Sequence, residues 1–159
     1  MPRELVRTPL PGTVPAARAA LLVAGDDRPF ALCGKWAGSQ ALVGSEPVRT
    51  ADPFAALAES DPAWPSDTGG QPGVPEEGVT GGGWFGVIPF PVGRQIERTG
   101  PPPPRPVPSP PSVMSFYDHL LRMDTSGQWW FEALWTEERE EALERRRDDL
   151  AARLARGVP

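Results

Sequence analysis

The chain has 159 residues and a formal net charge of −5 at pH 7, with 22 prolines, 17 glycines and one cysteine. Its length is typical of one domain, and an acidic chain without a basic stripe is a poor partner for a nucleic-acid backbone. One cysteine excludes an internal disulfide framework and favours a reducing compartment. The apolar run near the amino terminus is too short for a signal peptide or a membrane span. We therefore expect a cytoplasmic protein with neither a nucleic-acid nor a membrane partner.

The first third of the chain predicts short elements. Residues Val14–Ala24 are rich in alanine and leucine, which favours a short helix that Gly25 ends. Two short strands are expected next, at Phe30–Gly34 and Ala41–Ser45, with a glycine–serine turn between them.

A helix cap and two proline-rich segments organise the middle of the chain. Asp52 is a typical N-cap residue, and Pro53 suits the first position of a short helix. Prolines and glycines concentrate in residues 61–80 and 99–111, which we expect to be flexible, the second segment with polyproline II character. Between these segments, Trp84–Ile88 is typical of a buried strand.

The strongest pattern lies in the last third. Two aromatic-rich strands are expected at residues 112–124 and 128–135, joined by a turn in which Gly127 takes a left-handed conformation. Both faces of the second strand carry large apolar side chains, which predicts burial on both sides. A helix with an acidic first turn should begin after Thr136 as N-cap and end at Gly157. Its apolar stripe, which can dock on a sheet, consists of Leu143, Leu150 and Leu154.

The stretch VTGGGWFGVIPFPVGR, residues 79–94, raises a choice between anion binding and packing. A phosphate-binding loop lies between a strand and a helix, and a P-loop also carries a lysine. Here the glycines precede a strand and no lysine follows. We interpret Gly81–Gly83 as positions where missing side chains let Trp84 and its neighbours pack closely against another backbone.

No combination of residues predicts an active site. His119 is the only histidine and cannot form a metal site with Cys33 alone, and Asp118 beside it would point to the opposite strand face. A dyad of His119 with Ser115 is an open alternative, but a partly exposed hairpin histidine is the expected role. Cys33 is expected to be a small buried apolar residue. We predict no catalytic, cofactor-binding or metal-binding residue in the chain.

Three short motifs occur in a characteristic order. They are Gly44-Ser45-Glu46-Pro47, Gly82-Gly83-Trp84-Phe85-Gly86 and Tyr117-Asp118-His119. In this order they resemble the amino-terminal domain of component I of aminodeoxychorismate synthase, a family related to anthranilate synthase component I. By this resemblance the structural motif residues are Gly82, Gly83, Trp84, Gly86, Tyr117 and Asp118.

The resemblance implies a fold. We expect an α+β protein with an antiparallel sheet of short strands, helices packed at its edge and proline- and glycine-rich loops. Residues 1–159 would form a single amino-terminal domain, which is half of an anthranilate-synthase-component-I-like sandwich. The family's carboxy-terminal chorismate-binding domain has no counterpart in this chain.

The resemblance also implies a reaction that this chain supports without catalysing it. In the family, chorismate and ammonia from a glutamine amidotransferase subunit give 4-amino-4-deoxychorismate, a precursor of p-aminobenzoate and folate. The family's chorismate- and magnesium-binding residues lie in the carboxy-terminal domain, so this chain would hold no cofactor. Its implied partners are the chorismate-binding domain and the amidotransferase subunit.

An amino-acid pocket is a further feature of the family's amino-terminal domain. The resemblance places it here at Cys33, Gly34, Lys35 and Trp36. We expect the Trp36 side chain to fill this region itself and to make a ligand unnecessary.

Two functions follow from these observations. The chain is either the non-catalytic part of a chorismate-aminating synthase, which completes or stabilises the chorismate-binding domain, or a stand-alone interaction module or relic without enzymatic activity. The first predicts exposed apolar surface and unpaired strand edges on the isolated chain. The second predicts a well-behaved monomer.

Overall fold

The computed structural model describes residues 4–36, 38–59, 79–97, 100, 101, 104, 106, 107 and 111–158. The segments 61–80 and 99–111, which the sequence predicts to be flexible, lie largely outside the described residues.

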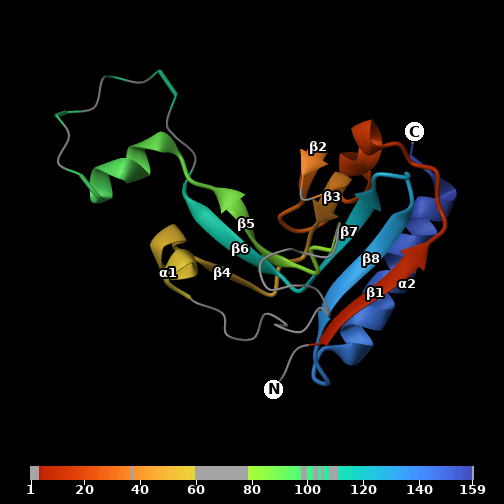
Figure 1. The fold of residues 1–159 in the computed structure, drawn as a ribbon. Helices are drawn as coiled ribbons and strands as arrows, with labels where there is room; N and C mark the ends of the chain where they lie inside the picture. The colour runs from red at the N-terminus through yellow and green to blue at the C-terminus, as the bar shows by residue number, and fades with distance from the viewer. Residues whose placement is uncertain are drawn as a thin grey trace.

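The described chain forms two antiparallel sheets (Figure 1). One has five strands in the order β1-β8-β7-β3-β2, and the other has three in the order β4-β6-β5. The strands are β1 (Glu4–Leu10), β2 (Phe30–Trp36), β3 (Ser39–Gly44), β4 (Arg49–Ala51), β5 (Gly83–Val87), β6 (Val113–Tyr117), β7 (His119–Asp124) and β8 (Trp129–Trp135). The α-helices are α1 (Pro53–Ala58) and α2 (Glu140–Arg156), and the 3-10 helices are η1 (Ala16–Leu22) and η2 (Phe90–Gln95). The predicted α+β fold with antiparallel sheets of short strands is confirmed.

The strand predicted over residues 112–124 is divided at Asp118. β6, before the bend, lies in the three-stranded sheet, and β7, after it, lies in the five-stranded sheet. One continuous segment therefore crosses between the sheets (Figure 1). At the crossing, the Leu134 amide of β8 donates a 2.7 Å hydrogen bond to the Asp118 carbonyl. The alternation of side chains in each half does not reveal the bend, since each half keeps its own period of two.

Strand β1 was not predicted from the sequence. It pairs with β8 from Glu4 opposite Trp135 to Leu10 opposite Trp129. Pro9 lies within it, which a strand tolerates at a sheet edge, and β1 is an edge strand. The sequence ELVRTPL has no clean alternation of apolar and polar residues, so it does not predict a strand by itself. The strand forms by pairing with β8, which is distant in the sequence.

The long carboxy-terminal helix covers a face of the five-stranded sheet. Leu143, Leu150 and Leu154 are buried as predicted, and they cluster with Trp129 and Phe131 of β8. The helix therefore packs on the sheet face, whereas edge packing was expected. On the other face of β8, Glu132 and Leu134 are also buried, so the predicted burial on both sides of this strand is confirmed.

The boundaries of α2 differ from the prediction at one end. The N-cap is Arg139, without a side-chain cap, because residues after Thr136 first form a turn in which the Arg139 amide bonds to the Thr136 carbonyl at 2.9 Å. The predicted cap at Thr136 is wrong. At the other end, Gly157 is the C-cap with a φ of 74°, as expected for glycine.

The short helices follow the sequence in part. Asp52 caps α1, and its Oδ1 accepts a 2.9 Å bond from the Phe54 amide, as predicted. Where a helix was expected at Val14–Ala24, the chain forms the shorter 3-10 helix η1. The residue before this helix, Pro15, has an extended conformation.

Candidate functional site

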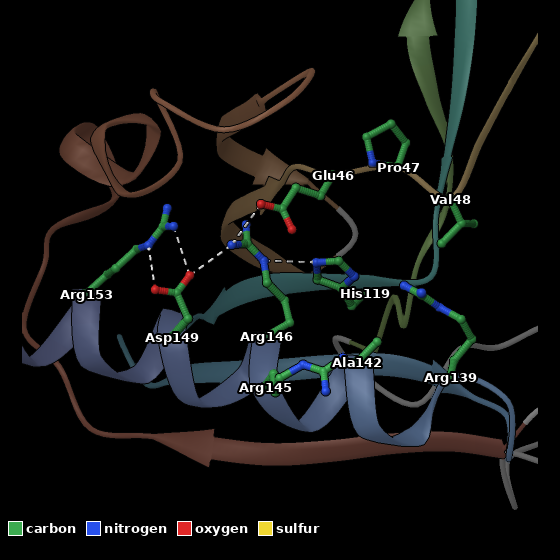
Figure 2. Close-up of a pocket in the computed structure, with 10 residues that line it drawn as sticks. All are labelled: Glu46, Pro47, Val48, His119, Arg139, Ala142, Arg145, Arg146, Asp149 and Arg153. Carbon is green, nitrogen blue, oxygen red and sulfur yellow. Dashed lines mark hydrogen bonds and ion pairs between the residues drawn. The ribbon is translucent and has the colours of Figure 1, made fainter.

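A cavity of about 500 Å³ lies between α2 and the loop that follows β3 (Figure 2). Residues Glu46–Val48 form one wall, and His119 of β7 lies between this loop and the helix. The helix side of the cavity carries four arginines, Arg139, Arg145, Arg146 and Arg153. The predicted G-x-x-P turn and the predicted YDH strand therefore meet at one cavity.

Arg146 is the central charge of this cavity and is buried. Its Nη2 donates to Asp26 at 2.6 Å and to the Ser45 hydroxyl at 2.5 Å. Its Nη1 donates to Asp149 at 2.9 Å, and its Nε donates to His119 Nε2 at 3.4 Å (Figure 2). All three guanidinium nitrogens therefore have acceptors inside the protein.

His119 and Asp118 form a buried pair, which corrects two expectations. His119 is 2% exposed rather than partly exposed, and its Nδ1 lies 2.8 Å from Asp118 Oδ1. The two side chains meet because Asp118 is the bend residue and does not follow strand alternation. Since Arg146 Nε can only donate, His119 Nε2 is the acceptor of that bond, and His119 Nδ1 is the nitrogen that donates to Asp118.

The Asp118 carboxyl is stabilised in its charged form. Burial alone would raise its pKa, but hydrogen bonds from His119 and from Arg139 Nε, at 2.8 Å, outweigh burial and hold the pKa below its usual range. Asp118 thus links the YDH motif to the first turn of α2.

The Asp26 carboxyl, which bonds to Arg146 and Arg153, is also stabilised in its charged form. Burial would raise the pKa of its carboxyl, yet bonds from Arg146, Arg153 and Ser45 lower it. Arg153 Nη1 lies 2.8 Å from Asp26 Oδ1. Beside this cluster, Glu46 has a positive φ of 57° and its amide bonds to the Asp27 carbonyl at 2.8 Å.

This network is suited to holding elements together. The lone pair of His119 is used by Arg146, and the Ser45 hydroxyl donates to Asp26 at 2.8 Å. Ser115, the alternative dyad partner, belongs to β6 in the other sheet. The geometry thus gives neither serine an activating base, and the cluster joins α2 to β7 and to the Asp26 loop.

The glycine stretch packs closely and also binds an anion of the protein itself. A Cβ at Gly82 would collide with the Tyr117 carbonyl oxygen, so the packing prediction is confirmed at this position, whereas one at Gly81 would meet the Leu5 side chain and one at Gly83 would meet no atom within 4 Å. Outside the predicted run, a Cβ at Gly86 would collide with the Val113 carbonyl oxygen. The amides of Thr80 and Gly81 donate to Glu132 Oε2 at 2.7 and 2.9 Å. The sequence did not predict this contact, in which the start of the glycine stretch binds the Glu132 carboxylate of the same chain.

The four residues of the expected amino-acid pocket lie on the outer strand β2, and none is buried. Cys33 is exposed and its Sγ lies 3.1 Å from the Ala16 carbonyl, so the expectation of a buried cysteine is wrong. Trp36 is 49% exposed, so its side chain does not fill the region as expected. Gly34 and Lys35 lie between them at an irregular part of the β2–β3 ladder.

An aromatic groove of about 590 Å³ adjoins the three-stranded sheet. The Phe30 and Phe85 rings stack at 4.0 Å, and the Tyr117 hydroxyl donates a 2.6 Å bond to the Arg28 carbonyl. Burial raises the Tyr117 pKa. Sequence reasoning missed this groove because it depends on β2 meeting β5, although the aromatic residues of both strands were visible.

Large apolar side chains are exposed where β5 leads into η2. Phe90 is 88% exposed and Ile96 is 71% exposed, and Val87 and Ile88 beside them are also exposed. β5 is an edge strand of the three-stranded sheet. This group of Val87, Ile88, Phe90 and Ile96 is called the β5–η2 patch below.

The described residues offer neither a metal cluster nor a membrane-spanning helix. No group of three His, Cys, Asp or Glu side chains in them is placed to hold a metal ion. No helix in the same part of the chain has the length and apolar content needed to cross a bilayer. Comparison of the chain with models of protein families, with curated proteins and with solved structures gives no match.

Proposed function

We propose that the chain is the non-catalytic amino-terminal part of a chorismate-aminating synthase. It would complete or stabilise a chorismate-binding domain that converts chorismate and glutamine-derived ammonia to 4-amino-4-deoxychorismate. Magnesium and chorismate would bind to that domain, and a glutamine amidotransferase subunit would supply the ammonia. The order of the three sequence motifs supports this reading.

The observation that carries the proposal is the β5–η2 patch. Large apolar side chains at 88% and 71% exposure, at the two ends of η2, are unusual for a domain that works alone. They lie next to an open strand edge, which offers unpaired backbone groups. A domain that docks against another would bury both features together.

The charged network beside α2 holds the motifs of the resemblance together. Arg146 bonds to Asp26, and Asp118 accepts from His119 and Arg139, so the network stiffens the domain. It also joins the G-x-x-P turn to the YDH strand, while Gly82 packs on the Tyr117 carbonyl. The motifs that carry the resemblance are thus neighbours in space.

The test mixes the purified chain with a separately expressed chorismate-binding domain of the family. Chorismate loss with ammonia and magnesium is followed with and without the chain, and the mixture is run on a size-exclusion column. We expect co-elution and a turnover that the chain raises. The double variant F90S/I96S should lose both effects, whereas Leu57→Ser, an exposed apolar residue of α1, should keep them.

Each other outcome has a distinct meaning. Co-elution without any change in turnover would favour an interaction module over a synthase part. Absence of both, with the chain folded by circular dichroism, would overturn the proposal. Equal losses in F90S/I96S and Leu57→Ser would show that the patch is not the contact.

A further inference from the structure

A second charged cluster lies on the face of the five-stranded sheet opposite α2. It consists of Arg122 of β7, Glu132 of β8 and Arg7 of β1. Glu132 alternates with Phe131, which faces α2, so its side chain points to the other side of the sheet. Arg122 is 1% exposed and Glu132 is 0% exposed.

Both oxygens of the Glu132 carboxylate accept hydrogen bonds within the protein. Its Oε1 accepts a 2.6 Å bond from Arg122 Nε and lies 3.7 Å from Arg7 Nε. Its Oε2 accepts the two amides of Thr80 and Gly81. Neither Nη1 nor Nη2 of Arg122 is among these donors.

Arg122 is only partly satisfied. Both Nη1 and Nη2 are buried, and neither has a hydrogen-bond partner among the described residues. The Thr80 hydroxyl, next to an amide that binds Glu132, is also buried and without a partner there. Buried donors of a guanidinium group are strongly destabilising unless an acceptor meets them.

Charge counting points to the kind of acceptor that is missing. Two guanidinium groups face one carboxylate, which leaves one positive charge on a cluster whose Arg122 and Glu132 are buried and whose Arg7 side chain is 32% exposed and lies over the Trp130 ring. A singly charged anion would balance it. The two Nη atoms of an arginine form a planar fork that matches the two oxygens of a carboxylate.

We propose that Arg122 binds the carboxylate group of a small monocarboxylic acid, with the Thr80 hydroxyl as an additional donor. This site is independent of the β5–η2 patch and of the proposed synthase role. Its occupant would neutralise the cluster and tie β7 to the glycine loop that already binds Glu132.

The experiment measures the melting temperature (Tm) of the full chain in sodium acetate. Sodium chloride at matched ionic strength and acetamide serve as references, since chloride lacks the planar oxygens and acetamide lacks the charge. We expect a saturable rise of roughly 3–6 °C at acetate near ten times its Kd. Sodium sulfate at the same ionic strength should give a smaller rise, because its double charge overcompensates the cluster.

Variants locate the effect. Arg122→Lys keeps the charge without the fork and should weaken acetate binding about tenfold, one hydrogen bond being lost. Arg122→Met should abolish the acetate-specific rise, and Arg145→Met, at an exposed arginine of α2, should keep it. If Arg122→Met does not fold, side-chain NMR of ¹⁵N-arginine in the wild type gives the same information, with a guanidinium signal that shifts with acetate and not with acetamide.

The proposal is overturned if acetate and chloride stabilise the wild type equally. It is also overturned if Arg122→Met retains the acetate-specific rise, or if sulfate matches acetate. Equal stabilisation by chloride would mean that Arg122 is already neutralised within the chain.

Discussion

The strands of the two sheets contain similar proportions of aromatic and aliphatic side chains but differ in what covers them. The five-stranded sheet is closed on one face by α2, with Phe131 and Trp129 completely buried. The three-stranded sheet leads into a patch whose Phe90 is 88% exposed. The two regions therefore differ in how far other parts of the chain cover their apolar side chains, and not in their apolar content. The first region is a core that the chain completes itself, and the second is the surface where we place a partner.

The segment through Asp118 joins these unequal regions. β6 and β7 are continuous in sequence, so the three-stranded sheet is tied through β6 to β7 of the five-stranded sheet. The Leu134 amide on the Asp118 carbonyl and the packing of Gly82 on Tyr117 reinforce the junction. An incompletely covered sheet can therefore be kept folded in the isolated chain.

The largest expected contrast is between two phenylalanines. Phe131→Ala removes a fully buried ring and should lower the free energy of unfolding by about 4 kcal/mol. Phe90→Ala should change it by less than about 0.5 kcal/mol, because the ring is already in water. Urea unfolding followed by tryptophan fluorescence measures both. Equal losses would mean that the β5–η2 patch is buried in solution and that the two regions do not differ as described.

The second prediction concerns the ion pairs that fix α2. Arg146→Met leaves Asp26 and its neighbours without their buried cation and should cost about 3 kcal/mol in urea unfolding. The matched control is Arg145→Met, whose pair with Glu141 is exposed and is worth less than about 0.5 kcal/mol. A loss in both variants of the same size would show that general charge, rather than the buried network, stabilises the helix.

The wild type and the Arg146→Met variant should also differ in how their stability responds to acid. The folded-state pKa of Asp26 is lowered from 3.8, so its contribution to stability is present above pH 3.8 and is lost as the pH falls through the lowered value. Removing Arg146 removes the largest single cause of that lowering. The gap in unfolding free energy between wild type and Arg146→Met should therefore narrow as the pH is taken from 6 to below 3.8. A constant gap would contradict the assigned cause.

Local patterns were enough to predict several parts of the fold. The β7–β8 hairpin, the leucine stripe of α2 and the Asp52 cap all depend on residues close in sequence. The burial of Arg146 was also available in the sequence, although it was missed. Arg146 lies three residues after Leu143 and four before Leu150, which places it on the apolar stripe that its neighbours Arg145 and Arg147 do not share.

Other parts were decided by contacts that no local pattern contains. β1 exists because β8 offers it a partner more than a hundred residues away, and its own sequence has weak strand character. Glu132 is buried because Arg122 and the Thr80–Gly81 amides converge on it from two other elements. The Asp118–His119 pair depends on a bend that the sheet order imposes. The candidate sites are built from side chains at places where elements distant in the sequence meet. This is why the sequence predicted the fold more readily than the sites.

The smallest predicted effect tests the junction between the sheets. Gly82→Ala places a Cβ against the Tyr117 carbonyl oxygen and 3.2 Å from Leu134 Cδ1, and should cost about 2 kcal/mol. Gly93→Ala in η2 meets no atom within 4 Å and should change stability by less than about 0.5 kcal/mol. Because the clash lies at the junction, amide hydrogen exchange in the Gly82 variant should rise in β5 and β6 more than in β7 and β8. Faster exchange that is uniform over both sheets would mean that they unfold as one unit, and the three-stranded sheet would then lack the separate behaviour that a docking region requires.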